Sequence, residues 1–114
     1  MTKQKKAGIL QGSLDLLVLQ TLKQGSMHGY SITRHLKSVS QEYLQIEEGS
    51  LYPALHRMER KGWIASHWGT SESNRRAKFY QLTREGKKQL KHETESWAKM
   101  SEAIDRVVNF QFSN

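Results

Sequence analysis

One segment of the chain, residues 63–83, interrupts the helical spacing of apolar residues that is found before and after it. Trp63–Trp68 and Arg75–Thr83 have the aromatic and aliphatic content of short strands, and Gly69–Asn74 between them consists of turn-forming residues. The segment therefore predicts a β-hairpin. Because the apolar residues elsewhere recur at helical spacing, we expect a fold that is mainly α with a small β-hairpin.

Three helices are predicted before the hairpin. Residues 9–24 form the first helix, which Gly25 ends. Gly29–Ser38 has helical spacing of its apolar residues and forms the second. The third helix opens at Glu48–Ser50 and ends at Gly62.

The third helix carries both a core stripe and a start signal. Leu51, Leu55 and Met58 fall at positions i, i+4 and i+7, which places them on one apolar face. Ser50 is the predicted N-cap. Pro53 is expected in the first turn, where its missing N–H is tolerated.

A fourth helix is predicted from Arg84 to Val108, with Thr83 as its N-cap. Its roughly 25 residues contain no proline and give a length of about 37 Å. One stripe alternates steps of four and three, through Leu90, Thr94, Trp97, Ser101, Ile104 and Val108. Because a small domain cannot cover so long a helix, its far end must pack on something else.

The first predicted helix also requires an additional packing partner, because its apolar residues leave no clean polar face. In so small a domain, a second subunit is expected to cover the additional apolar side, which indicates a symmetric dimer. The residues expected at the dimer interface are Ile9, Leu16, Leu19, Leu90, Trp97, Ile104 and Val108.

The order of these elements is that of a winged helix-turn-helix followed by a long C-terminal dimerisation helix. We assign residues 1–8 to a basic N-terminal arm, residues 9–83 to the winged helix-turn-helix domain and residues 84–114 to the dimerisation helix. In this architecture the second helix of the turn motif enters the DNA major groove with its N-terminal residues leading.

The charge of the chain narrows the class of partner. The sequence has 18 Lys and Arg residues against 11 Asp and Glu residues, a formal net charge of +7. This excess favours a polyanion, either nucleic acid or an anionic membrane surface, although a soluble basic protein without such a partner is the alternative. The apolar stretch near the N-terminus is too short and too polar to span a bilayer, and no signal-peptide cleavage site follows it. A cytoplasmic location without membrane contact is expected.

The outward face of the third helix is the first candidate site for double-stranded DNA. Ser50, Tyr52 and His56 can donate hydrogen bonds to phosphates or base edges, and either Arg57 or Arg60 can pair with guanine. An ordinary solvated helix face is the alternative. The hairpin adds cations that can reach the minor groove or its phosphates. The predicted DNA-binding residues are Ser50, Tyr52, Pro53, His56, Arg57, Arg60, Arg75, Arg76 and Lys78.

Trp97 allows two interpretations. A large aromatic residue in the middle of a dimer seam usually fills the core. Alternatively, two Trp97 side chains wall a pocket for a small aromatic effector, with Thr94 and Ser101 leaving the room that it needs. Trp63 and Trp68 are expected to pack the hairpin against the helices.

The sequence gives no support for an enzyme. Its five histidines lack metal-ligand spacing, it has no cysteine, and no glycine-rich phosphate loop is present. Asp15 and Asp105 lie at opposite ends of the chain, so they suggest no acid pair. No cofactor or metal is expected.

Several motifs together resemble those of the PadR-like transcriptional regulators. The most specific is the run Leu51-Tyr52-Pro53-Ala54-Leu55 within residues 48–59. It is followed by Gly62-Trp63-Ile64 and by Tyr80-Gln81-Leu82-Thr83 with Gly86, and it is preceded by Gly12-Ser13-Leu14 and His28-Gly29-Tyr30. The resemblance covers about residues 8–108, and the short C-terminal part is similar to that of the family's small subgroup.

The resemblance implies a homodimeric bacterial repressor of an inverted-repeat operator, often released by a small molecule. It also implies that the last helix contacts the partner's first helix, and that Ser50, Tyr52, Pro53, His56 and the arginines after them read the DNA. We therefore expect a sequence-specific transcriptional regulator, associated with the nucleoid when bound. A nonspecific architectural or protein-binding winged-helix module is the alternative.

Overall fold

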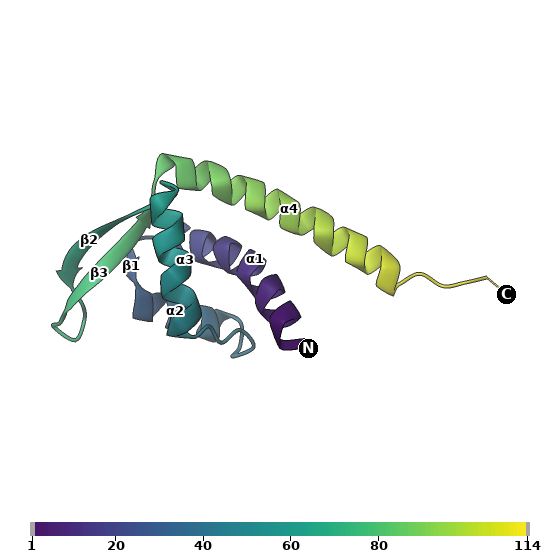
Figure 1. The fold of residues 1–114 in the computed structure, drawn as a ribbon, viewed down its shortest axis with the longest axis horizontal. Helices are drawn as coiled ribbons and strands as arrows, with labels where there is room; N and C mark the ends of the chain where they lie inside the picture. Colours follow the sequence, from purple (N-terminus) through teal and green to yellow (C-terminus); the bar gives the residue numbers. More distant parts are fainter. Residues whose placement is uncertain (1, 114) are drawn as a thin grey trace.

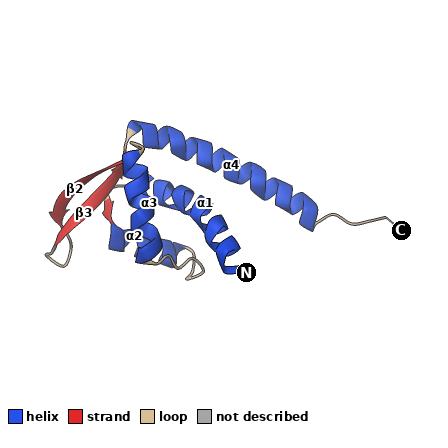
Figure 2. Cartoon of the chain, viewed as in Figure 1, coloured by secondary structure: helices blue, strands red, loops and turns tan. Residues whose placement is uncertain are grey.

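The computed structural model describes the backbone of residues 2–113 and the side chains of residues 13–113. Figures 1 and 2 show three helices packed together with a small sheet at one side of them, and a fourth, long helix that extends away on the other side. This confirms the expectation of a mainly α fold with a small β-hairpin. The elements in chain order are α1 (Thr2–Lys23), β1 (Met27–His28), α2 (Gly29–Val39), α3 (Glu48–Arg60), β2 (Ile64–Thr70), β3 (Arg76–Leu82) and α4 (Arg84–Val108).

Helix α1 begins earlier than the sequence predicted. Its backbone is helical from Thr2, so it includes most of the segment 1–8 that we expected to be an arm. The side chains of residues 1–12 lie outside the described residues, and with them the basic side chains of that arm and the expected interface residue Ile9.

The sheet has three strands in the order β1-β3-β2, all antiparallel. The sequence predicted β2 and β3 but not β1. Because β1 contains only two residues, Met27 and His28, it is too short to show alternation. It pairs with Tyr80 and Phe79 of β3, which ties the start of α2 to the wing.

The core lies where α1, α2 and α3 pack against one another and against the sheet. Leu51, Leu55 and Met58 of α3 are fully buried, which confirms the predicted stripe. Two residues expected at the dimer interface, Leu19 and Leu90, are also buried, with 0% and 6% of their surface exposed. They belong to the core of the single chain, because α4 packs on α1 within one subunit. Leu16 is only half buried.

The start of α3 differs from the prediction by three residues. Its N-cap is Glu47, whose side chain makes no capping hydrogen bond, and Ser50 lies within the first turn. Pro53 consequently lies in the interior of the helix. Its missing N–H leaves the carbonyl oxygen of Gly49 without its usual helical donor, and both residues are exposed.

Helix α4 has the predicted bounds and the predicted cap. The hydroxyl of Thr83 accepts a hydrogen bond from the N–H of Gly86 at 3.0 Å. A side chain at Gly86 would overlap the carbonyl oxygen of Trp63, so α4 leaves the domain in close backbone contact with the turn after α3.

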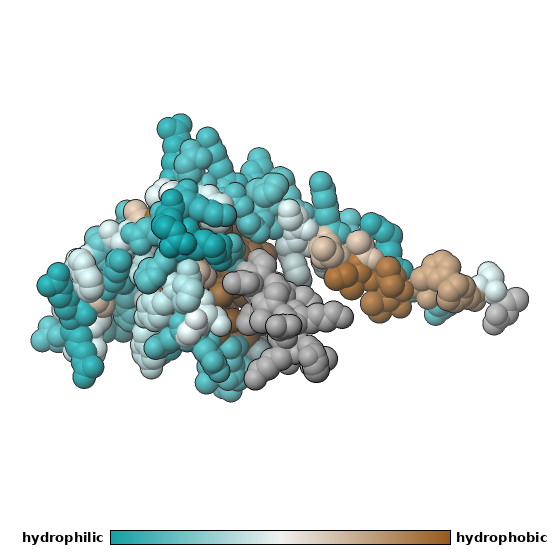
Figure 3. Space-filling view, in the orientation of Figure 1, coloured by the Kyte–Doolittle hydropathy of each residue, from teal (hydrophilic) through white to brown (hydrophobic). Residues whose placement is uncertain are grey.

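The second half of α4 extends away from the rest of the described chain (Figure 1), and apolar side chains form a patch on its surface (Figure 3). Trp97, Ile104 and Val108 are 52%, 50% and 71% exposed.

Candidate nucleic-acid interface

The N-terminal half of α3 presents most of the residues that were predicted to read DNA. Ser50, Pro53, His56 and Arg60 are exposed. They lie opposite the buried stripe of Leu51, Leu55 and Met58, so the core fixes which way they point.

Tyr52 has a more constrained position than these neighbours. Its ring lies over Gly29 at the start of α2, so closely that a side chain at position 29 would overlap the Tyr52 hydroxyl. Burial raises the pKa of the Tyr52 phenol, and the negative charge of Glu48 raises it further. Tyr52 therefore stays a neutral hydrogen-bond donor while packing α3 against α2.

Arg57 does not share the outward face. Its guanidinium donates two hydrogen bonds to the carboxylate of Asp15 on α1, from Nη1 to Oδ2 at 2.9 Å and from Nη2 to Oδ1 at 2.7 Å. The sequence left open whether Arg57 or Arg60 pairs with a base. The structure engages Arg57 within the subunit and leaves Arg60 exposed.

One face of the wing carries its cations. Cross-strand partners share a face of a sheet, and so do residues two apart along a strand. Trp68 pairs with Lys78 and Thr70 pairs with Arg76, so all four side chains are on the same face. This inner face is turned toward α3, because Ser66 on it donates a hydrogen bond to the Glu59 carboxylate at 2.6 Å.

The inner face of the wing and the start of α3 enclose a groove with a volume of about 590 Å³. Aromatic rings hold two of its cations. The Arg76 guanidinium lies 4.7 Å from the centre of the Trp68 ring, and the Lys78 ammonium lies 5.9 Å from the centre of the Tyr80 ring. The predicted residues that the structure brings together here are Tyr52, His56, Arg75, Arg76 and Lys78.

Trp68 is a groove residue that the sequence analysis assigned wrongly. It was expected to pack the wing against the helices, yet 58% of its surface is exposed. Trp63 does pack against the core, as predicted. The alternation of side chains along the strands could have revealed this position, because it places Trp68 on the same face of the sheet as Arg76 and Lys78.

The opposite face of the wing has a structural role. Phe79 stands between two histidines, His67 stacked at 5.7 Å and His28 edge-on at 5.3 Å. His28 also caps α2, since its Nδ1 accepts a hydrogen bond from the N–H of Ser31 at 3.3 Å. Within the described part of the chain, no cluster of three or more His, Cys, Asp or Glu residues could hold a metal ion.

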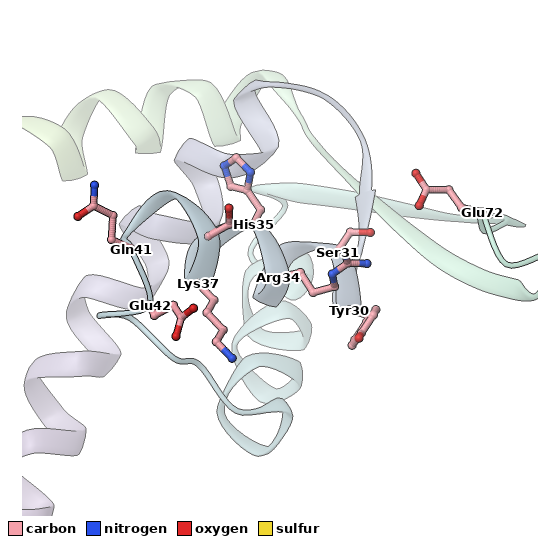
Figure 4. Close-up of a pocket in the computed structure, with 9 residues that line it drawn as sticks. Tyr30, Ser31, Arg34, His35, Lys37, Gln41, Glu42 and Glu72 are labelled. Carbon is pink, nitrogen blue, oxygen red and sulfur yellow. The ribbon is translucent and has the colours of Figure 1, made fainter.

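A broad depression of about 920 Å³ lies along the outer face of α2 (Figure 4). Arg34 and Lys37 come from α2, Glu42 from the loop after it and Glu72 from the tip of the wing. Because its lining contains both bases and acids, this depression is not selective for an anion. In a helix-turn-helix the first helix crosses the DNA backbone, so Arg34 and Lys37 are candidates for phosphate contacts that the sequence analysis missed.

The residues of the predicted effector pocket lie on the exposed part of α4. Thr94 donates a hydrogen bond to the Leu90 carbonyl at 2.8 Å, which occupies its hydroxyl within the helix. Ser101 is half buried and Trp97 is half exposed. Trp97 lines none of the pockets described for the single chain, so the effector pocket stays a proposal that depends on a second subunit.

The fold and the groove define a winged helix-turn-helix protein of the DNA-binding class. The chain belongs to the Transcriptional regulator PadR-like family, whose pattern matches residues 18–92. Members of this family are transcriptional regulators and not enzymes, which agrees with the absence of a predicted catalytic site.

Solved structures support the same assignment over most of the chain. A transcriptional regulator from Clostridium thermocellum is 31% identical with a TM-score of 0.82, and the match covers 90% of this chain and 99% of that one. A PadR-like transcriptional regulator from Bacillus cereus is 26% identical with a TM-score of 0.78, covering 91% and 99%.

A curated relative from Bacillus subtilis, Negative transcriptional regulator PadR, is 25% identical over 99 residues. The match covers 87% of this chain but 52% of the relative, so the chain spans about half the length of that regulator. Among the helices that the structure describes, none is long and apolar enough to cross a membrane.

Proposed function

We propose that the protein is a homodimeric, sequence-specific repressor of a pseudo-palindromic operator, acting in the bacterial cytoplasm on the nucleoid. The observation that carries this proposal is the shared groove. The exposed start of α3 and the cation-bearing inner face of the wing line the same space of about 590 Å³. The name of the Bacillus subtilis relative, a negative regulator, supports repression over activation.

The residues of the groove have distinct roles in this proposal. Ser50, Pro53 and His56 lead α3 into the major groove, where His56 is the exposed donor best placed for a base edge. In this proposal Tyr52 donates a hydrogen bond to the DNA backbone, and its ring packs α3 against α2. Arg60 lies near the C-terminal end of α3, so it contacts phosphates and does not lead into the groove.

The wing supplies contacts of another kind. Arg75 and Arg76 are exposed, and Lys78 is half buried between the Tyr80 ring and the Glu59 carboxylate, whose Oε1 lies 3.9 Å from its Nζ. Arg75 and Arg76 therefore reach the minor groove or its phosphates. Lys78 contributes mainly to the positive potential of the groove.

The dimer of this proposal is formed by α4 and by the exposed side of α1. In a monomer, α4 would leave Ile104, Val108 and their apolar neighbours as one patch in contact with water. Monomeric proteins rarely expose large apolar patches. A symmetric pair of α4 helices covers that patch and repeats the reading helix across a two-fold axis. In this proposal residues 9–83 bind DNA and residues 84–114 form most of the dimer interface, to which α1 also contributes.

The proposal also includes an effector site in the dimer interface. Two Trp97 side chains, one from each subunit, face each other across the two-fold axis, and Thr94 and Ser101 leave space beside them. A planar aromatic molecule that stacks there changes the separation of the subunits and so weakens operator binding. Titration of the protein–operator complex with planar aromatics, followed by Trp97 fluorescence and by DNA release, tests this, and Trp97→Ala must remove both responses.

The central test is selection of bound sequences from a pool of random duplexes, followed by affinity measurement at several salt concentrations. We expect a pseudo-palindrome bound at nanomolar Kd, with an affinity that falls steeply as salt rises. His56→Ala should cost about 1–3 kcal/mol and relax the preference at one position. Lys88→Ala, on the outside of α4, is the matched control and should leave the preference intact. Equal affinity for all duplexes would instead favour a nonspecific architectural protein.

A further inference from the structure

The pair between Asp15 and Arg57 differs from the other ion pairs of the described residues. The side chains of Asp15 and Arg57 are 13% and 29% exposed. In the pairs Lys88–Glu85 and Arg106–Glu102, every side chain is 65% exposed or more. The side chains of Lys78 and Glu59 are 35% and 33% exposed, but their nearest charged atoms are 3.9 Å apart. Asp15–Arg57 is also bidentate, a geometry that fixes direction as well as distance. Among the described residues it is the shortest ion pair and the most shielded one.

This pair joins helices that have different tasks. Arg57 is on the reading helix α3, and Asp15 is on α1, which packs on α4. The hydrogen bonds to Asp15 raise the pKa of Arg57, although its burial works in the opposite direction. The charges of Asp15 and of Glu93 on α4 raise it further. Three helices therefore act on one guanidinium.

The apolar contacts of α3 do not fix its orientation as sharply. Leu51, Leu55 and Met58 hold the helix against the core through burial, which is not directional. These contacts set which side of α3 faces outward, but they do not tie the helix to one neighbouring helix at a fixed angle as a bidentate ion pair does. The two hydrogen bonds between Arg57 and Asp15 resist rotation of α3, because both are short and both link α3 to α1.

We propose that Arg57 is a positioning residue, which locks the reading helix to α1 and so sets the spacing between the two half-sites of the operator. This inference rests on the proposed dimeric repressor. In a dimer the two reading helices sit one turn of DNA apart, about 34–36 Å. Their separation depends on how each α3 is held on the α1–α4 body. Arg57 acts on DNA recognition without touching DNA.

The experiment uses the selected operator and two variants of it, with one base pair added to or removed from the central spacer. The measured quantity is the ratio of affinities for the native and the altered spacing. Arg57→Lys keeps the charge but loses the two-pronged geometry, and Asp15→Asn keeps the shape but loses the charge. We expect both to lower the ratio by about 3- to 30-fold, while the base preference within each half-site stays unchanged.

Three controls make the result interpretable. Glu85→Gln removes the exposed ion pair with Lys88 and should leave the spacing ratio at the wild-type value. The double exchange Asp15→Arg with Arg57→Asp should restore part of the ratio. Thermal unfolding of each variant shows how much folded protein is present, and a change in stability alone lowers affinity for all spacings equally.

A second measurement needs no DNA. The chain has no cysteine, so Ser50→Cys gives each subunit of the dimer one spin label on α3. We expect a narrow distribution of distances between the two labels, which Arg57→Lys broadens or shifts and Glu85→Gln does not.

The outcomes separate this inference from the function on which it rests. A wild-type protein that selects no operator overturns the proposed function. A wild-type protein with a clear spacing preference, together with Arg57→Lys that keeps both the ratio and the label distances, overturns the inference alone. A change of base preference at one operator position in Arg57→Lys would assign Arg57 to base reading and also overturn it.

Discussion

The winged helix-turn-helix part of the chain, residues 13–83 and called the head below, buries its apolar stripes. The second half of α4 leaves its apolar stripe exposed. In the head, Leu55 and Met58 on the buried side of α3 are fully enclosed by α1, α2 and the sheet. On α4, Trp97 and Ile104 recur at helical spacing as regularly, yet half or more of their surface faces water. The same helical spacing of apolar residues therefore occurs in a buried stripe on α3 and in an exposed stripe on α4.

The difference teaches which parts of the molecule are complete in one chain. Burial of apolar surface is the main stabilising contribution in a small domain. The head obtains it from its own chain. The end of α4 leaves its apolar residues exposed in one chain, so in the proposed dimer its stability should depend on protein concentration and that of the head should not.

The largest expected effect breaks the enclosed region. Leu55→Ala leaves a cavity in the centre of the head and should lower the free energy of unfolding by about 2–5 kcal/mol. Chemical denaturation at several protein concentrations measures it. The loss should be the same at each concentration, and a loss that disappears at high concentration would mean that the head also depends on a partner.

The next largest effect is expected from a substitution in the exposed apolar stripe of α4. Ile104→Asp places a charge in the exposed apolar stripe of α4 and should weaken the proposed dimer by about 2 kcal/mol for each subunit. Sedimentation velocity gives the dimer dissociation constant, and far-ultraviolet circular dichroism shows whether the head stays folded. Glu102→Asp, in the same helix, is the control. An unchanged mass of Ile104→Asp in solution would place the dimer contact elsewhere.

A smaller effect concerns the charges of the wing. Arg75→Ala removes one exposed cation at the base of the hairpin turn and should lower the slope of operator affinity against salt concentration by about one unit. It should weaken binding to all sequences similarly. Lys87→Ala, an exposed cation on α4, leaves the slope unchanged if the wing and not the net charge carries the contact.

The smallest expected effect is a dependence on alkaline pH. Burial, together with the charge of Glu48, raises the pKa of Tyr52 in the folded chain above its ordinary value of about 10. The unfolded chain therefore loses this proton first, so the stability that Tyr52 contributes is present below pH 10 or so and is lost as the pH rises through the folded pKa.

Two variants sharpen this test. Tyr52→Phe should flatten the loss of stability above about pH 10, and Glu48→Gln should move the phenolate titration of Tyr52 to lower pH, both followed by ultraviolet absorbance and thermal unfolding. A slope that is unchanged in Tyr52→Phe would assign the alkaline loss to other groups, among them Tyr80, whose pKa is also raised by burial.

Local rules were sufficient for most of the fold. The bounds of α4 agree with the prediction, because Thr83 and the proline-free stripe after it are strong local signals. The hairpin was also found from its turn chemistry. The start of α3 was misplaced because Ser50 has the chemistry of a cap, whereas the helix begins at Glu48 without a side-chain cap.

The candidate site was harder to predict, since side-chain partners come from distant parts of the chain. Nothing within α3 indicates that Arg57 faces Asp15, which lies 42 residues earlier. Trp68 was expected to pack the wing against the helices, and only the register with β3 shows that it lies beside Arg76. Leu19 and Leu90 were assigned to a partner because periodicity does not tell which molecule covers a stripe.

The close backbone contact between Gly86 and Trp63 has a consequence for how proteins of this shape can diverge. It fixes the direction in which α4 leaves the head, so the helix behaves as an arm clamped at its base. Adding seven residues before the apolar stripe would keep its face nearly in phase and lengthen the arm by about 10 Å. Adding one or two would turn the stripe to another side of the helix. If α4 forms the proposed dimer, length changes along it should therefore be inherited in steps of whole heptads, each step giving a new operator spacing without a change in the reading residues.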